Sequence, residues 1–117
     1  MIALEERQLV YEYLMMDIAI RSLQYDIEHI QGLKYAELYV QQLSAVLTYL
    51  QRDFQWRKST LASKKIRLVK WVKVNEQFSD AVLTTTGEDA TIRFSALVLK
   101  QNSQLLISQK LLPISEI

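Results

Sequence analysis

The sequence is poor in the residues on which many functional sites depend. Its 117 residues include no cysteine, one histidine, one proline and two glycines. The absence of cysteine excludes a disulfide framework and thiolate metal sites. Because Gly32 and Gly87 are isolated, the sequence contains neither a GxGxxG fingerprint nor a Walker loop. Asp17 interrupts the best apolar stretch, so no run reaches the roughly 18 residues that a membrane-spanning helix needs.

The overall composition is that of a folded domain. Half of the residues are apolar, 23% are charged and the net charge is +1, which argues against a disordered chain. The length predicts a single domain covering residues 1–117. The first residues, MIALEERQL, are acidic and lack the apolar core of a secretory signal. We therefore expect a soluble, cytoplasmic protein with no membrane contact.

The first half of the chain has the periodicity of two helices. A 4-3 spacing relates the apolar residues Leu9, Tyr13, Met16, Ile20, Leu23, Ile27 and Ile30. This spacing predicts a helix over residues 4–31, with Gly32 as its left-handed C-terminal cap. A second periodic run predicts a helix from Lys34 to about Lys58, or as far as Lys64. The short connection makes the two helices antiparallel, so residues 1–64 should form a long helical hairpin.

Residues 65–95 are rich in β-branched and aromatic residues and predict a small antiparallel meander of three strands. The strands are expected at residues 66–74, 81–86 and 90–95, with a turn at 75–80. In the first strand, alternation places Ile66, Leu68, Val72 and Val74 on one face and Arg67, Val69, Trp71 and Lys73 on the other.

The last segment, residues 96–112, fits two interpretations. One is a C-terminal helix that Ser95 caps and that ends before Pro113, which we favour. The other is a pair of short strands around a turn at residues 100–103. The predicted fold class is therefore α+β: a long antiparallel helical hairpin, a small antiparallel β-meander and a C-terminal helix.

The hairpin raises a packing question. Two helices alone cannot bury both apolar seams, and a sheet of short strands covers only part of their length. This favours a homodimer, or a higher oligomer, in which two hairpins form a four-helix bundle. The alternative is a monomer whose sheet and last segment cover the seams. The candidate oligomer-interface residues are Leu9, Tyr13, Met16, Ile20, Leu23, Ile27, Tyr35 and Tyr39.

Positive charge is concentrated in residues 52–73, which contain eight of the 14 basic residues and a single acid, Asp53. Cations beside aromatic faces are what single-stranded nucleic acid requires of a binding surface. The segment could equally receive an acidic protein, including the acidic helices of a second copy, or serve only a helix end and a sheet edge. The candidate binding residues are Arg57, Lys58, Lys64, Lys65, Arg67, Lys70, Trp71 and Lys73.

Residues suited to catalysis are scarce. Asp26 and His29 share a predicted helix face, as in the metal-binding pair of di-iron bundles, but such a site needs a second histidine, which only the symmetry of a dimer would supply. We therefore expect no metal, no cofactor, no small-molecule substrate and no enzymatic activity. The sequence favours a non-enzymatic interaction module, homodimeric through its helices, that binds a protein partner. The alternative is a nucleic-acid-binding protein that uses residues 52–73.

Overall fold

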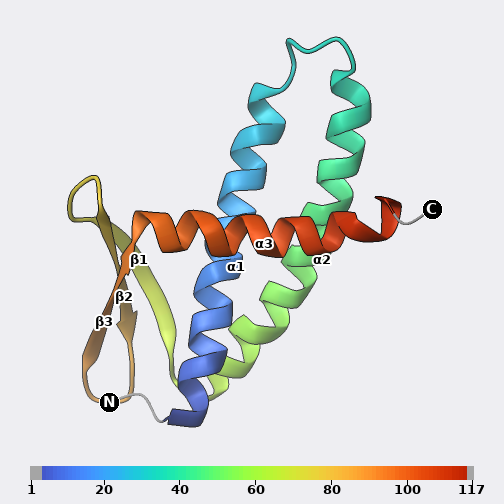
Figure 1. Ribbon diagram of the computed structural model, residues 1–117. Helices are drawn as coiled ribbons and strands as arrows, with labels where there is room; N and C mark the ends of the chain where they lie inside the picture. The colour runs from blue at the N-terminus through green and yellow to red at the C-terminus, as the bar shows by residue number, and fades with distance from the viewer. Residues whose placement is uncertain (1–3, 116–117) are drawn as a thin grey trace.

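The computed structural model describes residues 4–115 and has the predicted α+β architecture (Figure 1). A helical hairpin is followed by a three-stranded antiparallel sheet and by a C-terminal helix, which excludes the interpretation of residues 96–112 as strands. The elements are α1 (Leu4–His29), α2 (Ala36–Ser63), β1 (Arg67–Lys73), β2 (Phe78–Thr84), β3 (Asp89–Ser95) and α3 (Ala96–Ser115).

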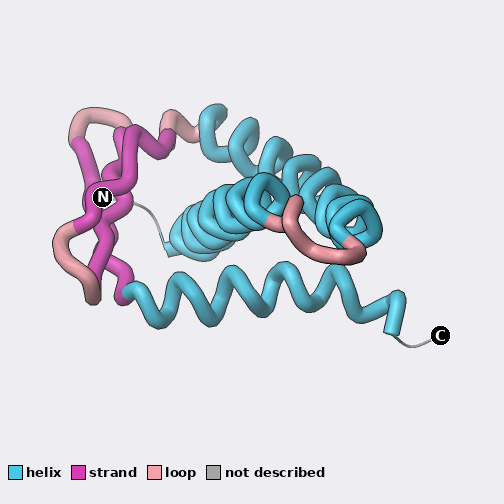
Figure 2. The backbone as a smooth tube through the Cα atoms, turned by 90° about the horizontal axis from the view of Figure 1, so that it is seen from above, coloured by secondary structure: helices cyan, strands magenta, loops and turns pink. Residues whose placement is uncertain are grey.

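Helix α1 is the central element. Viewed from above, it lies between the sheet, α2 and α3 (Figure 2). One core cluster joins α1 to the sheet and to the end of α2, and includes the fully buried residues Leu14 and Leu83. A second cluster joins α1 to α2 around Ala19 and Leu50, and partly buried residues of α3 pack against it. The proximal part of the hairpin, which we define as α1 up to Leu23 and α2 from Val46, thus buries its apolar seam inside a single chain.

Helix α3 crosses both helices of the hairpin (Figure 1) and starts directly at the end of β3. The Ser95 Oγ accepts a hydrogen bond from the backbone N–H of Val98 at 3.1 Å, which confirms the predicted N-terminal cap. The helix was predicted to end before Pro113, and this prediction is wrong, because the helix continues to Ser115. A proline this close to the end of a helix removes only one backbone donor.

The sheet has the order β1-β2-β3, which makes β1 an edge strand. The pairing of β1 with β2 shifts between Leu68 and Lys70, so Val69 is an extra residue in a β-bulge. The bulge reverses the alternation of side chains, and Trp71 therefore lies on the same inner face as Leu68. The prediction that grouped Trp71 with Arg67 is wrong for this reason.

The first turn of the meander is shorter than predicted. The Asn75 side-chain oxygen accepts hydrogen bonds from the backbone N–H groups of Gln77 and Phe78, at 2.8 and 3.0 Å. This Asx turn completes the reversal within three residues. Strand β2 consequently starts at Phe78 rather than at residue 81.

The two helix ends of the hairpin differ from expectation. Among the described residues, positive φ angles occur at Gly87 and Lys65 only, so the predicted left-handed cap at Gly32 is wrong. Helix α2 has the left-handed end instead. The N–H of Lys65 bonds to the carbonyl of Ala62, and the N–H of Ile66 bonds to that of Leu61, both at 2.9 Å. This is a Schellman motif in which a lysine occupies the position that glycine usually takes.

Candidate interaction surfaces

The predicted oligomer seam on α1 lies inside the chain. Tyr13, Met16, Ile20 and Leu23 are buried, and Leu9 and Ile27 are half-buried. Because α2, α3 and the sheet cover these positions, α1 does not present them to a second copy. Tyr35 and Tyr39, the two candidates beyond this seam, are exposed.

Two cations of the basic segment are paired with acids of α1. The Arg57 Nε lies 3.6 Å from the Glu12 carboxylate, and the Lys64 Nζ lies 4.0 Å from that of Glu6. These contacts hold the last turns of α2 against the first turns of α1. Arg57 also donates a hydrogen bond to the backbone carbonyl of Asp53.

The other candidate cations, Lys58, Lys65, Arg67, Lys70 and Lys73, have no ion pair within the part of the chain that the structure describes. They are spread over several elements: Lys58 lies on α2, Lys65 follows the end of that helix, and β1 carries the other three from its first to its last residue. Lys65 and Arg67 border a shallow hollow of about 570 Å³ between the end of α2 and the β2–β3 turn, which three threonines also line.

The two tryptophans have different environments. Trp71 is half-buried, and its indole Nε1–H donates to the Asp17 carboxylate at 2.8 Å. The same carboxylate accepts from Arg21 at 2.8 Å, and the Trp71 ring packs against Phe94. Trp71 therefore ties β1 to α1 and does not offer a free face to a nucleobase. Trp56 is 60% exposed.

Buried polar groups beside the sheet have structural partners. Burial raises the pKa of the Tyr13 hydroxyl, and the nearby Asp17 carboxylate adds to this effect. On the solvent face of the sheet, two hydrogen bonds from Arg93 hold the pKa of Asp80 below its usual range.

Among the described residues, no three His, Cys, Asp or Glu side chains lie close enough to hold a metal ion. Nor does any helix in residues 4–115 have the length and apolar character to cross a membrane.

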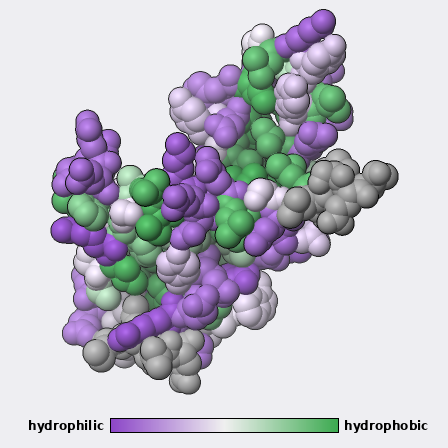
Figure 3. All heavy atoms as spheres, in the orientation of Figure 1, coloured by the Kyte–Doolittle hydropathy of each residue, from purple (hydrophilic) through white to green (hydrophobic). Residues whose placement is uncertain are grey.

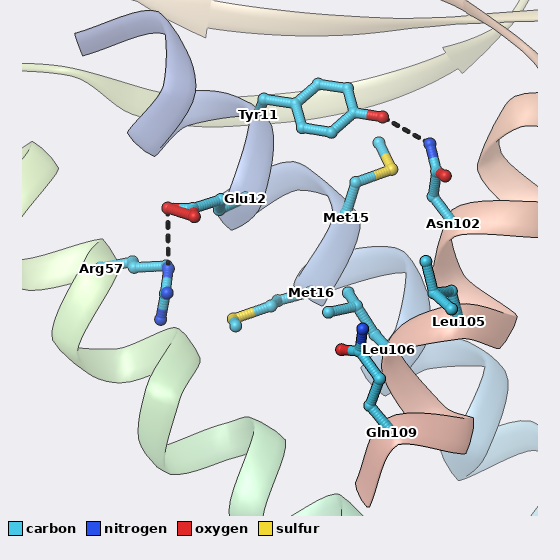
Figure 4. A pocket seen from close by; sticks show the side chains of 9 residues that line it. All are labelled: Tyr11, Glu12, Met15, Met16, Arg57, Asn102, Leu105, Leu106 and Gln109. Atoms are coloured by element: carbon cyan, nitrogen blue, oxygen red, sulfur yellow. Dashed lines mark hydrogen bonds and ion pairs between the residues drawn. The ribbon is translucent and has the colours of Figure 1, made fainter. Parts of the chain in front are cut away.

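A pocket of about 210 Å³ lies where the three helices meet (Figure 4). Met15, Met16 and Leu106 give it an apolar lining. At its edges, Asn102 donates a hydrogen bond to the Tyr11 hydroxyl, and Arg57 faces Glu12. Its volume is below the roughly 300–1,000 Å³ of most small-molecule sites. Tyr11 and Asn102 are hydrogen-bonded to each other, whereas the buried Arg57 Nε faces Glu12 without a hydrogen bond.

The distal hairpin, which we define as residues 24–45, contains no buried residue. It extends beyond α3, and hydrophobic residues are visible on its surface (Figures 1 and 3). We call four of its large exposed side chains the distal surface: Tyr25, Leu33, Tyr35 and Tyr39, with exposed fractions of 39% to 60%. Leu33 and Tyr35 also line a shallow hollow of about 490 Å³ at the hairpin connection.

Helix α2 has a second exposed set of apolar residues, which sequence reasoning missed. We call Leu38, Ala45, Tyr49 and Trp56 the α2 stripe, and all four are exposed. Their spacings of 7, 4 and 7 residues place them on one helix face. The spacing is visible in the sequence, but the periodic run that predicted this helix consists of the residues that face the core, such as Leu50 and Phe54.

Comparison with known proteins gives one match. A family model described as YhjD protein matches residues 1–112, nearly the whole chain. No curated protein and no solved structure matches it. The chain therefore belongs to the YhjD family.

Proposed function

We propose that this member of the YhjD family is a cytoplasmic, non-enzymatic interaction module, homodimeric through its helices, that binds a protein partner through the distal surface. The observation that carries the proposal is the uncovered distal hairpin. Over residues 24–45 no side chain is buried, although the segment includes Leu33 and Tyr35, each more than half exposed. These two residues line the same hollow, and exposed apolar side chains that lie together mark protein interfaces.

The chemistry of the distal surface suits a protein partner. Tyrosine combines a large apolar ring with a polar hydroxyl and loses little conformational entropy on binding, so it is enriched in interfaces. Two of these rings have charged or polar neighbours: Lys34 lies 5.4 Å from the Tyr35 ring centre, and His29 stacks on Tyr25 at 3.9 Å. The surface thus has the aromatic centre and polar rim that protein interfaces combine.

The test compares the wild-type chain with the double variant Leu33→Ser/Tyr35→Ser. Each is used as bait for proteins from the source cell, and a captured protein is then purified and titrated by calorimetry. We expect at least a 10-fold loss of affinity in the double variant, because two anchoring side chains are removed. Leu97→Ser is the matched control, since Leu97 is 63% exposed but lies on α3.

A partner that binds the double variant as tightly as the wild type would place the protein interface elsewhere. If the wild type, the double variant and Leu97→Ser captured the same proteins equally well, the protein interface would likewise lie outside the distal surface. Loss in the double variant but not in Leu97→Ser supports the proposal.

Nucleic-acid binding is the second candidate function, and the cations without ion pairs favour it. Lys58, Lys65, Arg67, Lys70 and Lys73 have no acid partner among the described residues. Fluorescence anisotropy of labelled single-stranded and duplex oligonucleotides at about 50 and 200 mM salt tests it, because phosphate contacts release counterions. Salt-sensitive binding that Lys65→Glu/Arg67→Glu abolishes would support this function. Absence of binding at the lower salt would exclude it.

A further inference from the structure

The α2 stripe has the pattern of a helix–helix seam, and its four residues remain exposed although Lys110 of α3 lies over the Tyr49 ring. Gln42 and Arg52 fill the gaps between its four apolar residues, which gives successive spacings of 4, 3, 4, 3 and 4 residues from Leu38 to Trp56. This is the heptad spacing of a coiled coil. At 1.5 Å per residue the seam is about 27 Å long. Leu38, Tyr49 and Trp56 are each more than half exposed along it.

We propose that the α2 stripe binds the same stripe of a second copy, with the two α2 helices antiparallel about a two-fold axis level with Leu47. The inference rests on the proposed function and specifies the contact that makes the homodimer. A two-fold interface must be self-complementary, because the same patch is used on both chains. The register that places Leu38 opposite Trp56 and Ala45 opposite Tyr49 meets this condition.

In that register each of the two aromatic residues of the stripe faces an aliphatic residue of the other copy. Trp56 of one copy packs on Leu38 of the other, and Tyr49 packs beside Ala45. A hollow of about 310 Å³ lies next to Ala45, and Gln42 and Tyr49 also line it. It provides room for the tyrosine ring of the second copy. Packing a large residue against a small one is what lets facing seams interdigitate.

Charge decides between antiparallel and parallel helices. A parallel pair would bring Arg52 against Arg52 at the seam, and like charges placed opposite each other are destabilising. The antiparallel register instead faces Arg52 with Gln42, whose side-chain carbonyl can accept hydrogen bonds from the guanidinium.

The charge at the two ends of the hairpin favours the same orientation. The distal hairpin contains the acids Asp26, Glu28 and Glu37 and one lysine, whereas the opposite end of α2 and the residues after it are strongly basic. In an antiparallel pair the acidic end of one copy lies beside the basic end of the other, whereas a parallel pair places ends of the same charge side by side. The occupant that fits this face is therefore a second copy of this chain.

Tyr49 is already oriented at the centre of the seam. The Lys110 Nζ lies 4.4 Å from the centre of its ring and 3.8 Å from the Asp53 carboxylate. Tyr49 as a whole nevertheless remains 54% exposed. A side chain held in place before association loses less conformational entropy on binding.

The first experiment measures mass by light scattering and sedimentation between about 5 and 200 μM, because a single helix face gives a reversible dimer. Ala45→Arg places a charge at the centre of the seam and should weaken dimerisation at least 10-fold. Gln51→Arg is the matched control, since Gln51 is also exposed on α2 but lies outside the stripe. Circular dichroism checks that both variants keep their helices.

The second experiment fixes the direction of the helices by disulfide formation under oxidised glutathione. The chain has no cysteine, so Gln42→Cys/Arg52→Cys introduces the only thiols. Within one chain the two positions are about 15 Å apart along the helix, too far for a disulfide. An antiparallel dimer brings residue 42 of one copy to residue 52 of the other and should be trapped as a covalent dimer. Gln42→Cys alone should stay largely uncrosslinked.

The outcomes separate this inference from the proposed function. A dimer that Ala45→Arg does not weaken, or that Gln42→Cys alone crosslinks, overturns the antiparallel α2 contact and leaves a homodimer that uses another face. A monomer at all concentrations overturns this inference and the homodimeric part of the proposed function together. Partner capture by the distal surface would be unaffected by either result.

Discussion

The proximal and distal parts of the hairpin have the same two helices but different surroundings. In the proximal part, α2, α3 and the sheet enclose α1, and Leu14 and Leu23 are at most 1% exposed. In the distal hairpin α3 approaches α2 at residues 41–45, where Lys110 lines the same hollow, and no residue between Leu23 and Val46 is buried. A pair of helices needs a third element to form a core. Stability is thus concentrated in one half, and the other half is left as surface.

The strongest way to test this comparison is to remove the same side chain from each half. Leu14→Ala should lower the free energy of unfolding by about 2–5 kcal/mol, because it leaves a cavity in the core. Leu33→Ala in the distal hairpin should change it by less than about 0.5 kcal/mol. Urea unfolding at low protein concentration measures both. Similar costs at the two positions would mean that the distal hairpin is part of the core.

Hydrogen exchange tests the same difference without mutation. Backbone amides of α1 between residues 24 and 29 should exchange at least about 100-fold faster than those between residues 10 and 20, because local opening of the distal end exposes no core. Mass spectrometry at a protein concentration low enough to dissociate the proposed dimer gives the comparison. Equal protection of both stretches would show that the hairpin opens only as a whole.

The periodicity of apolar residues was sufficient to predict the helices of the fold. The 4-3 spacing from Leu9 to Ile30 predicted α1, and Ser95 was correctly identified as the cap of α3. Periodicity shows which face of a helix is apolar but not what covers it. The seam assigned to a second copy is covered by α2, α3 and the sheet. The way in which α3 crosses the hairpin is a three-dimensional arrangement that no local pattern encodes.

The candidate sites were harder to predict for a related reason. Alternation in β1 placed Trp71 with the cations, and a single inserted residue, Val69, reversed that assignment. A bulge of this kind leaves no consistent mark in composition. The ion pairs of Arg57 and Lys64 depend on how α2 packs against α1, so the sequence could count these cations but could not show which were paired.

The junction between α1 and the sheet offers a smaller test within the proximal part. Asp17→Ala should cost about 1–3 kcal/mol, because it leaves the half-buried Trp71 N–H without its acceptor. Arg21→Ala removes the other partner of the same carboxylate but should cost less than about 0.5 kcal/mol, since Arg21 is well exposed. Thermal unfolding of both variants measures the difference. Equal costs would mean that the surface ion pair, not the indole hydrogen bond, stabilises this junction.

The smallest changes in the free energy of unfolding are expected from substitutions at Lys65 and Gly32, near the two helix ends. Both substitutions should stabilise the protein. Lys65 has a φ of 63°, where a side chain is strained, so Lys65→Gly should raise the free energy of unfolding by about 0.5–1 kcal/mol. Gly32 lacks a positive φ, and an added Cβ would meet no atom within 4 Å. Gly32→Ala should therefore add about 0.4–1 kcal/mol by restricting the unfolded chain.

The matched control for both variants is Gly87→Ala. Gly87 also has open space around it, but its φ is 89°, so alanine there should destabilise the protein. Opposite signs at Gly32 and Gly87 would show that backbone conformation, not space, decides the outcome. Destabilisation by Gly32→Ala would mean that the hairpin connection requires a glycine at this position. Gly32 would then have a positive φ angle, unlike in the structure described above.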